Sequence, residues 1–393
     1  MSQINVRNLS NENEDGAPNL VGISTFSATS YIVPPVGTTQ QRPQNPQGGD
    51  LRFNTDTASL EYYRGDGIGW SQIEMTSPNI GVSTAASTQS TKGTGARGLY
   101  GGGQVAPSTG SYTNAIDYLT ISTLGNAEDF GNLDNNRTGR GVLSSTTRAV
   151  FGCGYGPADD IVYVTMASKG DAITFGLELG NADGRAGLSD GVRGCFGGQI
   201  TGGDDNVISY ITIATTGNTK DFGDLIQSRK NSASMASSTR GVFAGGSSGD
   251  NEYNNIEYVT IRTTGNAIDF GDLSYTATNS VAGGSNSIRG VMWGGTDSPG
   301  YSTVNNIEYL TIATKGNSID FGDTTVTTQG GSACPDPTRL VMKLGSQTNG
   351  TTVTRNIEYV QIATTGNSVD FGDSVNETYS SSVGSCSTGH GGL

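Results

Sequence analysis

The hydrophobic positions of the chain recur in one pattern. The hexapeptide at Ile256, IEYVTI, returns as IDYLTI, IVYVTM, ISYITI, IEYLTI and IEYVQI, which begin at Ile116, Ile161, Ile208, Ile307 and Ile357. The six copies start 45, 47, 48, 51 and 50 residues apart. A period of this length is typical of a solenoid or propeller repeat.

Each hexapeptide predicts one strand of a hairpin. A small polar turn such as Thr263-Thr264-Gly265-Asn266 follows it, and then a second run ends in Phe-Gly, 12 residues after the tyrosine in every copy. Gly and Asn tolerate the positive φ that a tight turn demands, so the two runs pair as strands.

Two further strands precede each hairpin. One is of the type Arg240–Gly246 (RGVFAGG), with counterparts that start at Arg97, Arg148, Arg193, Arg289 and Arg339, and small-residue segments such as 231–238 come before it. Apolar side chains on both sides of the hexapeptide predict a sheet that is covered on both faces. Four strands at this period indicate a propeller blade.

The glycine doublets, the tyrosine and the strand order resemble the kelch-type propeller. The resemblance covers about three quarters of the chain, but Phe stands where the kelch repeat has Trp, and the last doublet is reduced to Leu344-Gly345. The resemblance implies an all-β fold with a six-bladed kelch-like β-propeller over residues 81–393. The terminal segment 383–386 is expected to supply an inner strand beside 97–103, which would close the ring and hide edge strands.

Residues 1–80 contain no repeat. Pro34, Pro35, Pro43 and Pro46 predict an extended, linker-like stretch over 33–50, as part of an N-terminal arm or linker over 1–50. Alternating runs around 56–59 and the following Gly-rich turn predict a small β-meander over 51–80. A unit of this size is too short to bury a core of its own, so we expect it to pack on the propeller or on copies of itself.

Length variation is confined to one set of loops. The Arg-to-Ile spacing runs 19, 13, 15, 16, 18 and 18, whereas the Phe-to-next-Arg spacing is 18 or 19 throughout. The loops between the second and third strands therefore form the natural recognition face, although they could instead simply close turns. Tyr and Asp side chains there suit a sugar or protein ligand. The candidate residues are Tyr112, Tyr155, Asp204, Asp205, Asp250, Tyr253 and Tyr301.

Composition excludes several classes of protein. Charged residues are only 15%, glycines number 60, and the net charge is −14, so helix bundles and nucleic-acid binding are disfavoured. No apolar run is long enough to span a membrane, and no leader follows Met1. The four scattered cysteines lack zinc spacing and are expected to be free. No cofactor or metal is expected.

Motifs that resemble catalytic ones are expected to be structural. Asp-Phe-Gly recurs five times as a strand ending, without the other kinase motifs. Gly245-x-Ser247-x-Gly249 falls in a strand-to-strand loop, and His390 lies in the terminal tail, so a Ser-His-Asp triad is not expected. Glu257 and its counterparts Glu308 and Glu358 lie in separate repeats, which argues against a glycosidase pair. The protein is therefore expected not to be an enzyme.

The six repeated arginines fit two different roles. They could ring an anionic ligand, or each could pair with a repeat carboxylate such as Asp269 or Glu257 and fix the geometry of the blade. The second is the expected one, because guanidinium and carboxylate groups form strong bidentate pairs.

The N-terminal segment GTTQQRP, with Asn45-Pro46 and the run DLRFNTDTASLEYYRGDGIGW, resembles a motif of tailed-phage fibre and appendage proteins. Together with the IEYVTIATTGNAxDFGDL-type repeat, it makes the whole chain similar to virion structural proteins of phages that infect marine cyanobacteria. The resemblance implies localisation in the virion, attachment to other virion proteins through the N-terminal region, and a homo-oligomer, with a trimer as the simplest guess. The propeller would bind a host-surface glycan or protein. The alternative is a purely architectural or decoration role without a host ligand.

Overall fold

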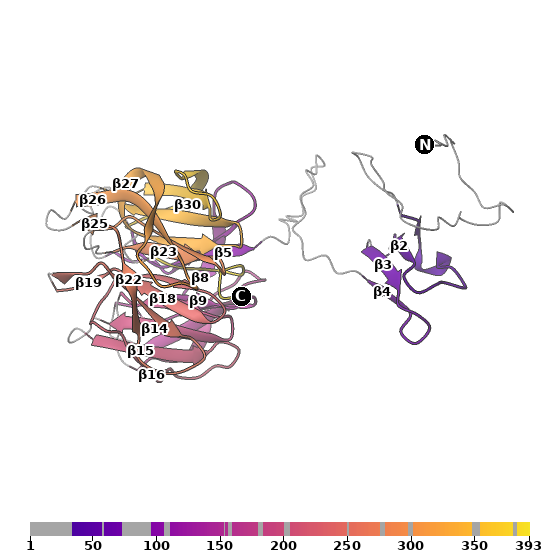
Figure 1. Ribbon diagram of the computed structural model, residues 1–393, viewed down its shortest axis with the longest axis horizontal. Coiled ribbons are helices and arrows are strands. Elements are labelled where there is room, and N and C mark those ends of the chain that lie inside the picture. The colour runs from indigo at the N-terminus through magenta and orange to yellow at the C-terminus, as the bar shows by residue number, and fades with distance from the viewer. Residues whose placement is uncertain are drawn as a thin grey trace. The chain divides into compact units, whose positions relative to one another are not determined.

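The computed structural model describes residues 34–56, 59–72, 96–105, 111–152, 154–155, 159–179, 184–199, 205–249, 251–275, 280–297, 302–347, 354–379 and 383–393. The chain divides into two compact units, Met1–Thr76 (unit 1) and Ser77–Leu393 (unit 2) (Figure 1). Apart from one 3-10 turn, the regular elements of the described residues are all strands. The predicted all-β class is confirmed.

Unit 1 is a single four-stranded sheet of order β1-β2-β3-β4. Its elements are β1 (Val36–Gly37), the 3-10 turn η1 (Thr39–Gln41), β2 (Leu51–Asn54), β3 (Ser59–Tyr63) and β4 (Trp70–Gln72). Strand β1 pairs with β2 in parallel, and the other pairs are antiparallel. The meander expected around 56–59 is therefore present.

Residues 34–50 differ from the separate arm expected over 1–50. Val36 pairs with Phe53 across the sheet, and the Arg42 guanidinium binds the Glu61 carboxylate with its Nε and Nη2 at 3.1 and 2.6 Å. Arg52 Nη1 and Asn54 Nδ2 also donate to Glu61. The prolines kept the segment extended, but an extended segment can still add a strand to a sheet edge.

The described residues of unit 2 form four four-stranded antiparallel sheets, one two-stranded sheet and one nine-stranded sheet. We divide the nine-stranded sheet at its long strand, Ile319–Pro335, which gives six groups of four principal strands that we call sheets 1 to 6 in chain order. Sheet 1 is β31 (Gly384–Ser387), β5 (Arg97–Gly101), β7 (Ala115–Thr120) and β8 (Glu128–Asn132). Sheet 2 is β9 (Val142–Ser144), β10 (Arg148–Phe151), β11 (Asp160–Thr165) and β12 (Ile173–Leu177). Sheet 3 is β13 (Ala186–Ser189), β14 (Arg193–Gln199), β15 (Asp205–Thr212) and β16 (Lys220–Asp224).

Sheet 4 is β17 (Ala233–Ala236), β18 (Arg240–Ala244), β21 (Asn255–Thr260) and β22 (Ile268–Asp272). Sheets 5 and 6 share one long strand and follow each other as β23 (Ala282–Ser285), β24 (Arg289–Trp293), β26 (Ser302–Thr311), β27 (Ile319–Pro335), β28 (Arg339–Ser346), β29 (Thr354–Gln361) and β30 (Val369–Tyr379). Short strands β6 (Gln104–Val105), β19 (Ser247–Ser248), β20 (Asn251–Glu252) and β25 (Thr296–Asp297) lie in the loops.

The apolar core lies between neighbouring sheets. Six clusters of buried side chains each join two consecutive sheets, and one of them joins sheet 6 to sheet 1 through Val341 and Tyr100. The tyrosine and phenylalanine of each repeat pack edge to face, as Tyr258 and Phe270 do with ring centroids 6.0 Å apart. Covering both faces of every sheet explains why the hexapeptide is apolar on both sides.

The first strands of the six sheets contact one another in a closed cycle, β31, β9, β13, β17, β23, β27 and back to β31. Serines bridge this cycle, because the inner edge of each first strand has no pairing strand. Ser285 Oγ, for example, accepts from the Ala236 amide at 2.9 Å and donates to the Ala236 carbonyl at the same distance. Ser385 makes the same pair of bonds to Ala333.

The six repeated arginines do not follow the expected pairing with carboxylates. Each donates from Nη1 to a backbone carbonyl of the next sheet, as Arg240 does to Ile312 at 2.7 Å, and Arg339 of sheet 6 reaches Ile121 of sheet 1. Each also lies over the tyrosine of its own sheet, at 4.3 Å for Tyr258. The carboxylate of Glu257 binds Arg229 instead. The arginines thus tie sheets together through the main chain.

The predicted hairpin turn has a second role that the sequence did not reveal. Gly265 donates its amide to the Phe222 carbonyl of the preceding sheet at 2.8 Å, and Asn266 Oδ1 accepts from the Asp224 amide at 3.1 Å. The glycine after each Phe lies against this turn, since a Cβ on Gly271 would sit 2.4 Å from the Gly316 carbonyl oxygen. The Gly-Asn turn and the Phe-Gly ending are therefore two halves of one contact between sheets.

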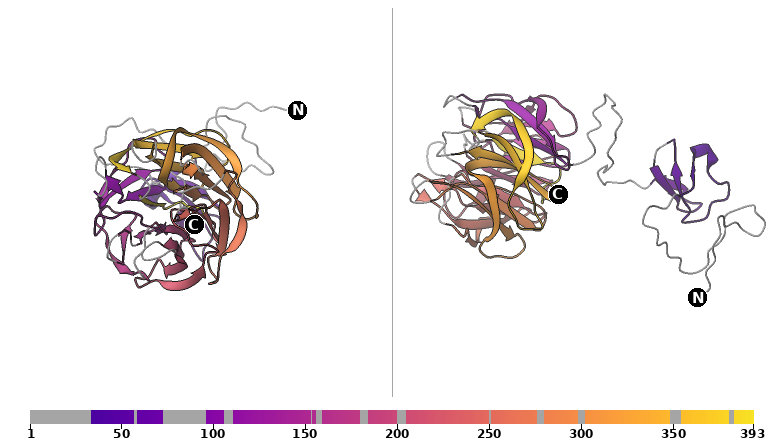
Figure 2. Two further views of the ribbon diagram at one scale, coloured as in Figure 1. Left: turned by 90° about the vertical axis from the view of Figure 1, so that its left-hand side faces the viewer. Right: turned by 90° about the horizontal axis from the view of Figure 1, so that it is seen from above.

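The C-terminal segment supplies the inner strand of sheet 1. Strand β31 pairs antiparallel with β5, with Cys386 opposite Leu99. The predicted pairing of 383–386 with 97–103 is confirmed. Figure 2 shows the C-terminal segment near the centre of the six sheets.

Candidate recognition face and central cavity

The loops between second and third strands lie at one end of unit 2. The last residues of the first strands bond to one another, as Ser189 Oγ does to the Ser144 carbonyl and Ser387 Oγ does to the Pro335 carbonyl, so these strands run in one direction. Strands β19 and β25, which belong to these loops, lie opposite the C-terminal segment and the start of β5 (Figure 1). We call the end with these loops the loop face. The chain enters unit 2 at the other end.

Two of the predicted recognition residues come together on the loop face. The Tyr112 and Tyr155 rings belong to sheets 1 and 2, and their centroids are 6.2 Å apart at an interplanar angle of 55°. Tyr155 is 58% exposed, and Tyr112 is half-buried. The Tyr155 amide donates to the Thr138 carbonyl at 2.8 Å, which fixes the loop. An exposed aromatic pair with hydroxyl groups can stack on a sugar ring or pack against a protein side chain.

A small ionic network lies beside this pair. Arg137 is buried, and its Nη2 lies 3.6 Å from the Asp160 carboxylate and 4.0 Å from that of Asp134. The Asp160 side chain is 37% exposed and therefore remains open to a ligand. The sequence did not single out these residues, because they belong to no repeated motif.

Two other predicted residues, Tyr253 and Asp205, lie on other parts of the described structure. Tyr253 is half-buried on sheet 4 and lies 5.7 Å from the Arg229 guanidinium. Asp205 begins β15, where it pairs with Gln199. Asp204, Asp250 and Tyr301 lie outside the described residues. The structure thus brings two of the seven candidates, Tyr112 and Tyr155, close together.

A second contact joins two loops of the same face. Thr296 Oγ1 donates to the Glu252 carboxylate at 3.1 Å, across from sheet 5 to sheet 4. Burial raises the pKa of Glu252, the Thr296 hydrogen bond opposes that shift, and nearby Asp297 adds to it. This hydrogen bond therefore joins neighbouring loops of sheets 4 and 5.

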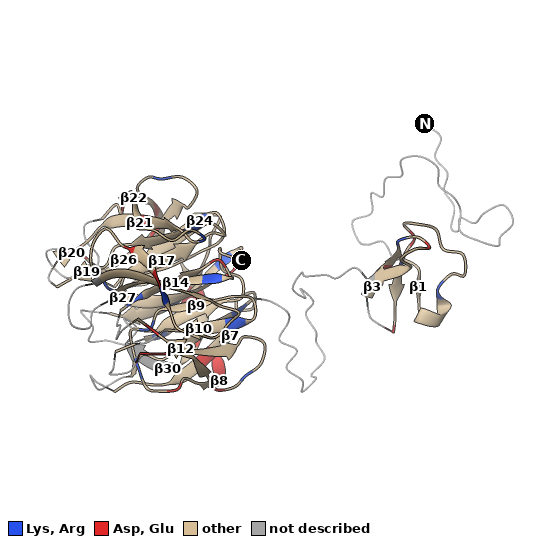
Figure 3. Cartoon of the chain, turned by 90° about the horizontal axis from the view of Figure 1, so that it is seen from below, with Lys and Arg blue, Asp and Glu red and all other residues tan. Residues whose placement is uncertain are grey.

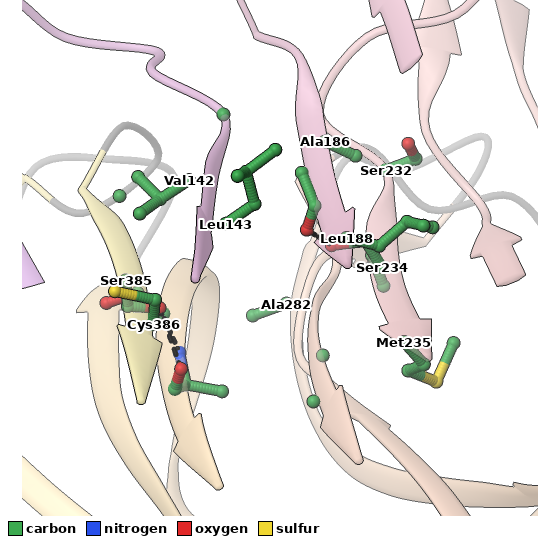
Figure 4. Close-up of a pocket in the computed structure, with 18 of the residues that line it drawn as sticks. Val142, Leu143, Ala186, Leu188, Ser232, Ser234, Met235, Ala282, Ser385 and Cys386 are labelled. Carbon is green, nitrogen blue, oxygen red and sulfur yellow. Dashed lines mark hydrogen bonds between the residues drawn. The ribbon is translucent and has the colours of Figure 1, made fainter. Parts of the chain in front are cut away.

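The first strands enclose a central cavity of about 160 Å³. Val142 and Leu143 of β9, Leu188 of β13 and Cys386 of β31 lie around it (Figure 4). Many of its other lining residues are Gly, Ala and Ser, and several of these serines already bond to neighbouring strands. The cavity has the size of a few water molecules, and its lining lacks an acid and base pair.

His390 lies at one end of the cavity. Its Nε2 is 3.0 Å from the Ser144 carbonyl oxygen, and its Nδ1 accepts the Gly392 amide at 3.1 Å. These two partners fix the neutral tautomer with the proton on Nε2. Burial lowers the pKa of His390, although the Ser144 carbonyl and the Asp190 charge oppose that shift. Gly391 donates to the Ser285 carbonyl, so the tail lies across the ends of several first strands.

The catalytic-looking motifs occupy structural positions. Glu257 is fully buried and accepts from the Ile226 amide at 2.7 Å, while Glu308 and Glu358 accept from serine and threonine hydroxyls of adjacent strands. Ser247 lies in β19 at the loop face, and His390 lies at the opposite end. Among the described residues, no group of three or more His, Cys, Asp or Glu side chains is arranged to hold a metal ion. Cys195, Cys334 and Cys386 are buried and free, and Cys153 lies outside the described residues.

Lys343 is a buried charged residue that the sequence pattern did not indicate. Lys343 is 2% exposed, and burial lowers its pKa to about 8, against the opposing charge of Asp117 on the neighbouring sheet. Its repeat counterparts are Gly101, Gly152, Gly197, Ala244 and Trp293, so no repeated pattern marked the position.

Charges of both signs are interspersed over the side of unit 2 seen in Figure 3, without a basic stripe. Within the described segments, no helix is both long and apolar enough to cross a bilayer. A scan against protein-family models finds no match, and a search of curated proteins finds no relative.

Proposed function

We propose that the chain is a non-enzymatic structural protein of a tailed-phage virion, a fibre or appendage component. The six sheets form the blades of a kelch-like propeller, and the loop face binds a host-surface glycan or protein. Unit 1 attaches the chain to other virion proteins, and the chain works as a homo-oligomer, with a trimer as the simplest case.

The closed cycle of first strands supports the propeller. Every sheet contacts the next through its arginine and the preceding one through its Gly-Asn turn, which is Gly170-Asp171 in sheet 2, and sheet 6 returns to sheet 1 through Arg339 and Ile121. Such closure leaves only the outermost strands as edges, which is how propellers limit edge exposure.

The observation that carries the recognition role is the exposed Tyr112–Tyr155 pair on the loop face. It lies at the end of unit 2 opposite Ala96, the first described residue of that unit. An exposed surface with variable loops and paired aromatic rings suits an external ligand. The loops themselves stay positioned by the constant strands beneath them.

The test is binding of the purified chain to intact marine cyanobacterial cells and to their isolated envelope glycans. Tyr155→Ala should weaken binding about tenfold, which corresponds to about 1.4 kcal/mol for the lost aromatic contact. Ile288→Ala is the matched control, because Ile288 is 66% exposed in the turn between β23 and β24, at the opposite end. Equal binding by wild type and Tyr155→Ala would reject the aromatic pair as the site.

The alternative is a purely architectural role in the particle. No binding to cells or glycans by the wild-type chain, with the protein nevertheless seen in purified particles, would favour it. Turnover of an envelope glycan by the purified chain would contradict the non-enzymatic proposal.

A further inference from the structure

The buried side chains of unit 1 are polar or charged instead of hydrophobic. Arg52, Asn54 and Glu61 are its buried side chains, whereas the buried hydrophobic residues of the described chain all lie in unit 2. Arg42 and Arg52 both lie over the Trp70 ring, at 5.9 and 6.0 Å, on the same side of the sheet. One face of the sheet is therefore filled by an ionic cluster.

The opposite face of this sheet is apolar and largely uncovered. Strand alternation and register place five side chains there, because Val36 and Leu60 are both opposite Phe53 and Leu51 is opposite Tyr62. Val36 is 57% exposed and Leu51 is 46% exposed, while Phe53, Leu60 and Tyr62 are half-buried. We call these five residues the apolar face of unit 1. A contiguous exposed apolar patch of this kind marks an interaction surface.

The charge pattern identifies the occupant. The five side chains of the apolar face carry no charge, although the whole chain has a net charge of −14. Two copies of this chain would therefore repel each other across most surfaces but meet here without like charges in contact. The buried ionic cluster of the unit is already paired on the other face, where Arg42, Arg52 and Asn54 bind Glu61, so it does not have to be desolvated again.

We propose that the apolar face of unit 1 is the surface through which copies of this chain associate. The proposal rests on the homo-oligomer of the proposed function and assigns the residues that form it. An uncharged apolar face is self-complementary, which is what a symmetric interface between identical subunits requires.

The test is the oligomeric state of the full chain, measured by sedimentation velocity over a concentration series. The wild-type chain should associate, and Leu51→Glu should raise the dissociation constant at least a hundredfold, because symmetry brings the new charges together. Ile68→Glu is the matched control: Ile68 is 61% exposed in the same unit, but it lies in the turn between β3 and β4. It should leave association unchanged.

Three results would overturn the assignment in distinguishable ways. A monomeric wild-type chain would reject both the homo-oligomer and this surface. Association unaffected by Leu51→Glu, or weakened equally by Ile68→Glu, would reject the surface alone. If Leu51→Glu misfolds, Val36→Glu on the neighbouring strand tests the same surface through its effect on association. Circular dichroism of each variant checks that it is folded. Particle localisation tests the virion role independently.

Discussion

At the scale of single residues, His390 is the group whose charge state the fold constrains most clearly. Its Nδ1 must accept from Gly392 while its Nε2 donates to Ser144, and only the neutral ring does both. Protonation would place a second donor against the Gly392 amide. His390 therefore links the docking of the C-terminal tail to pH.

We expect the stability of unit 2 to fall as the pH drops below the ordinary histidine value of about 6.5. The lowered pKa of His390 means that the unfolded state binds more protons, so this contribution is fully present above that pH and is lost below it. Thermal unfolding between pH 7.5 and 5 measures the effect, which should be roughly 1 kcal/mol for one lost hydrogen bond.

His390→Gln is the matched variant, since the chain has one histidine. This variant should lose the part of the pH dependence that lies between pH 6.5 and 5. Asp190, which is bound by Arg262, and Asp336 in the turn beside Gly389 are the other charged groups near the tail. An unchanged pH profile in His390→Gln would assign the effect to these carboxylates instead.

At the scale of elements, the contact between each Gly-Asn turn and the preceding Phe-Gly ending determines how closely two sheets approach. Gly271 has φ of 154° and lies against the Gly316 main chain, whereas Gly265 has φ of 153° and open space where a Cβ would stand. The two glycines share a backbone conformation and differ in their surroundings. A comparison of substitutions at the two positions therefore distinguishes backbone strain from steric exclusion.

We expect Gly271→Ala to lower the free energy of unfolding by roughly 3 kcal/mol, because the added methyl must displace the main chain of the next sheet. Gly265→Ala should cost only about 1 kcal/mol, from its backbone conformation alone. Chemical denaturation of both variants measures the difference. Equal losses would show that strain, and not the close approach, requires glycine at position 271.

At the scale of the whole molecule, the pairing of β31 with β5 joins the C-terminal segment to the first repeat. Val383 and Cys386 are buried in this sheet, and Ser387 Oγ bonds to the Pro335 carbonyl of the neighbouring first strand. Removing the strand would leave β5 as an open edge and sheet 6 without its neighbour.

Deletion of 383–393 should therefore cost roughly 4 kcal/mol or more for the lost apolar burial and should promote aggregation. Deletion of 388–393 alone keeps β31, which ends at Ser387, and should cost much less. Calorimetry and light scattering compare the two truncated chains. Equal melting temperatures would contradict a closing role for β31.

The repeat, its four strands and the closing strand followed from the sequence because they depend on local pattern and on the need to cover sheet edges. The hexapeptide is apolar on both sides, so its sheet had to be covered on both faces. The prolines indicated extended backbone, but they did not say that Val36 and Gly37 pair with a neighbouring strand. Among the described recognition residues, Tyr112 and Tyr155 meet while Tyr253 lies beside Arg229, since spacing along the chain does not fix the distance between loops of different sheets.

The sequence by itself determined the number of repeats, the strands within each repeat and the confinement of length variation to one set of loops, since all of these depend on residues close together in the chain. The tertiary structure alone decided the partners of the six arginines and the contact between turn and Phe-Gly ending, because both reach into the next sheet. It also decided that unit 1 buries Arg52 and Glu61 and exposes Val36 and Leu51. Strand alternation separates the two faces of a sheet, and only the fold shows which face is covered.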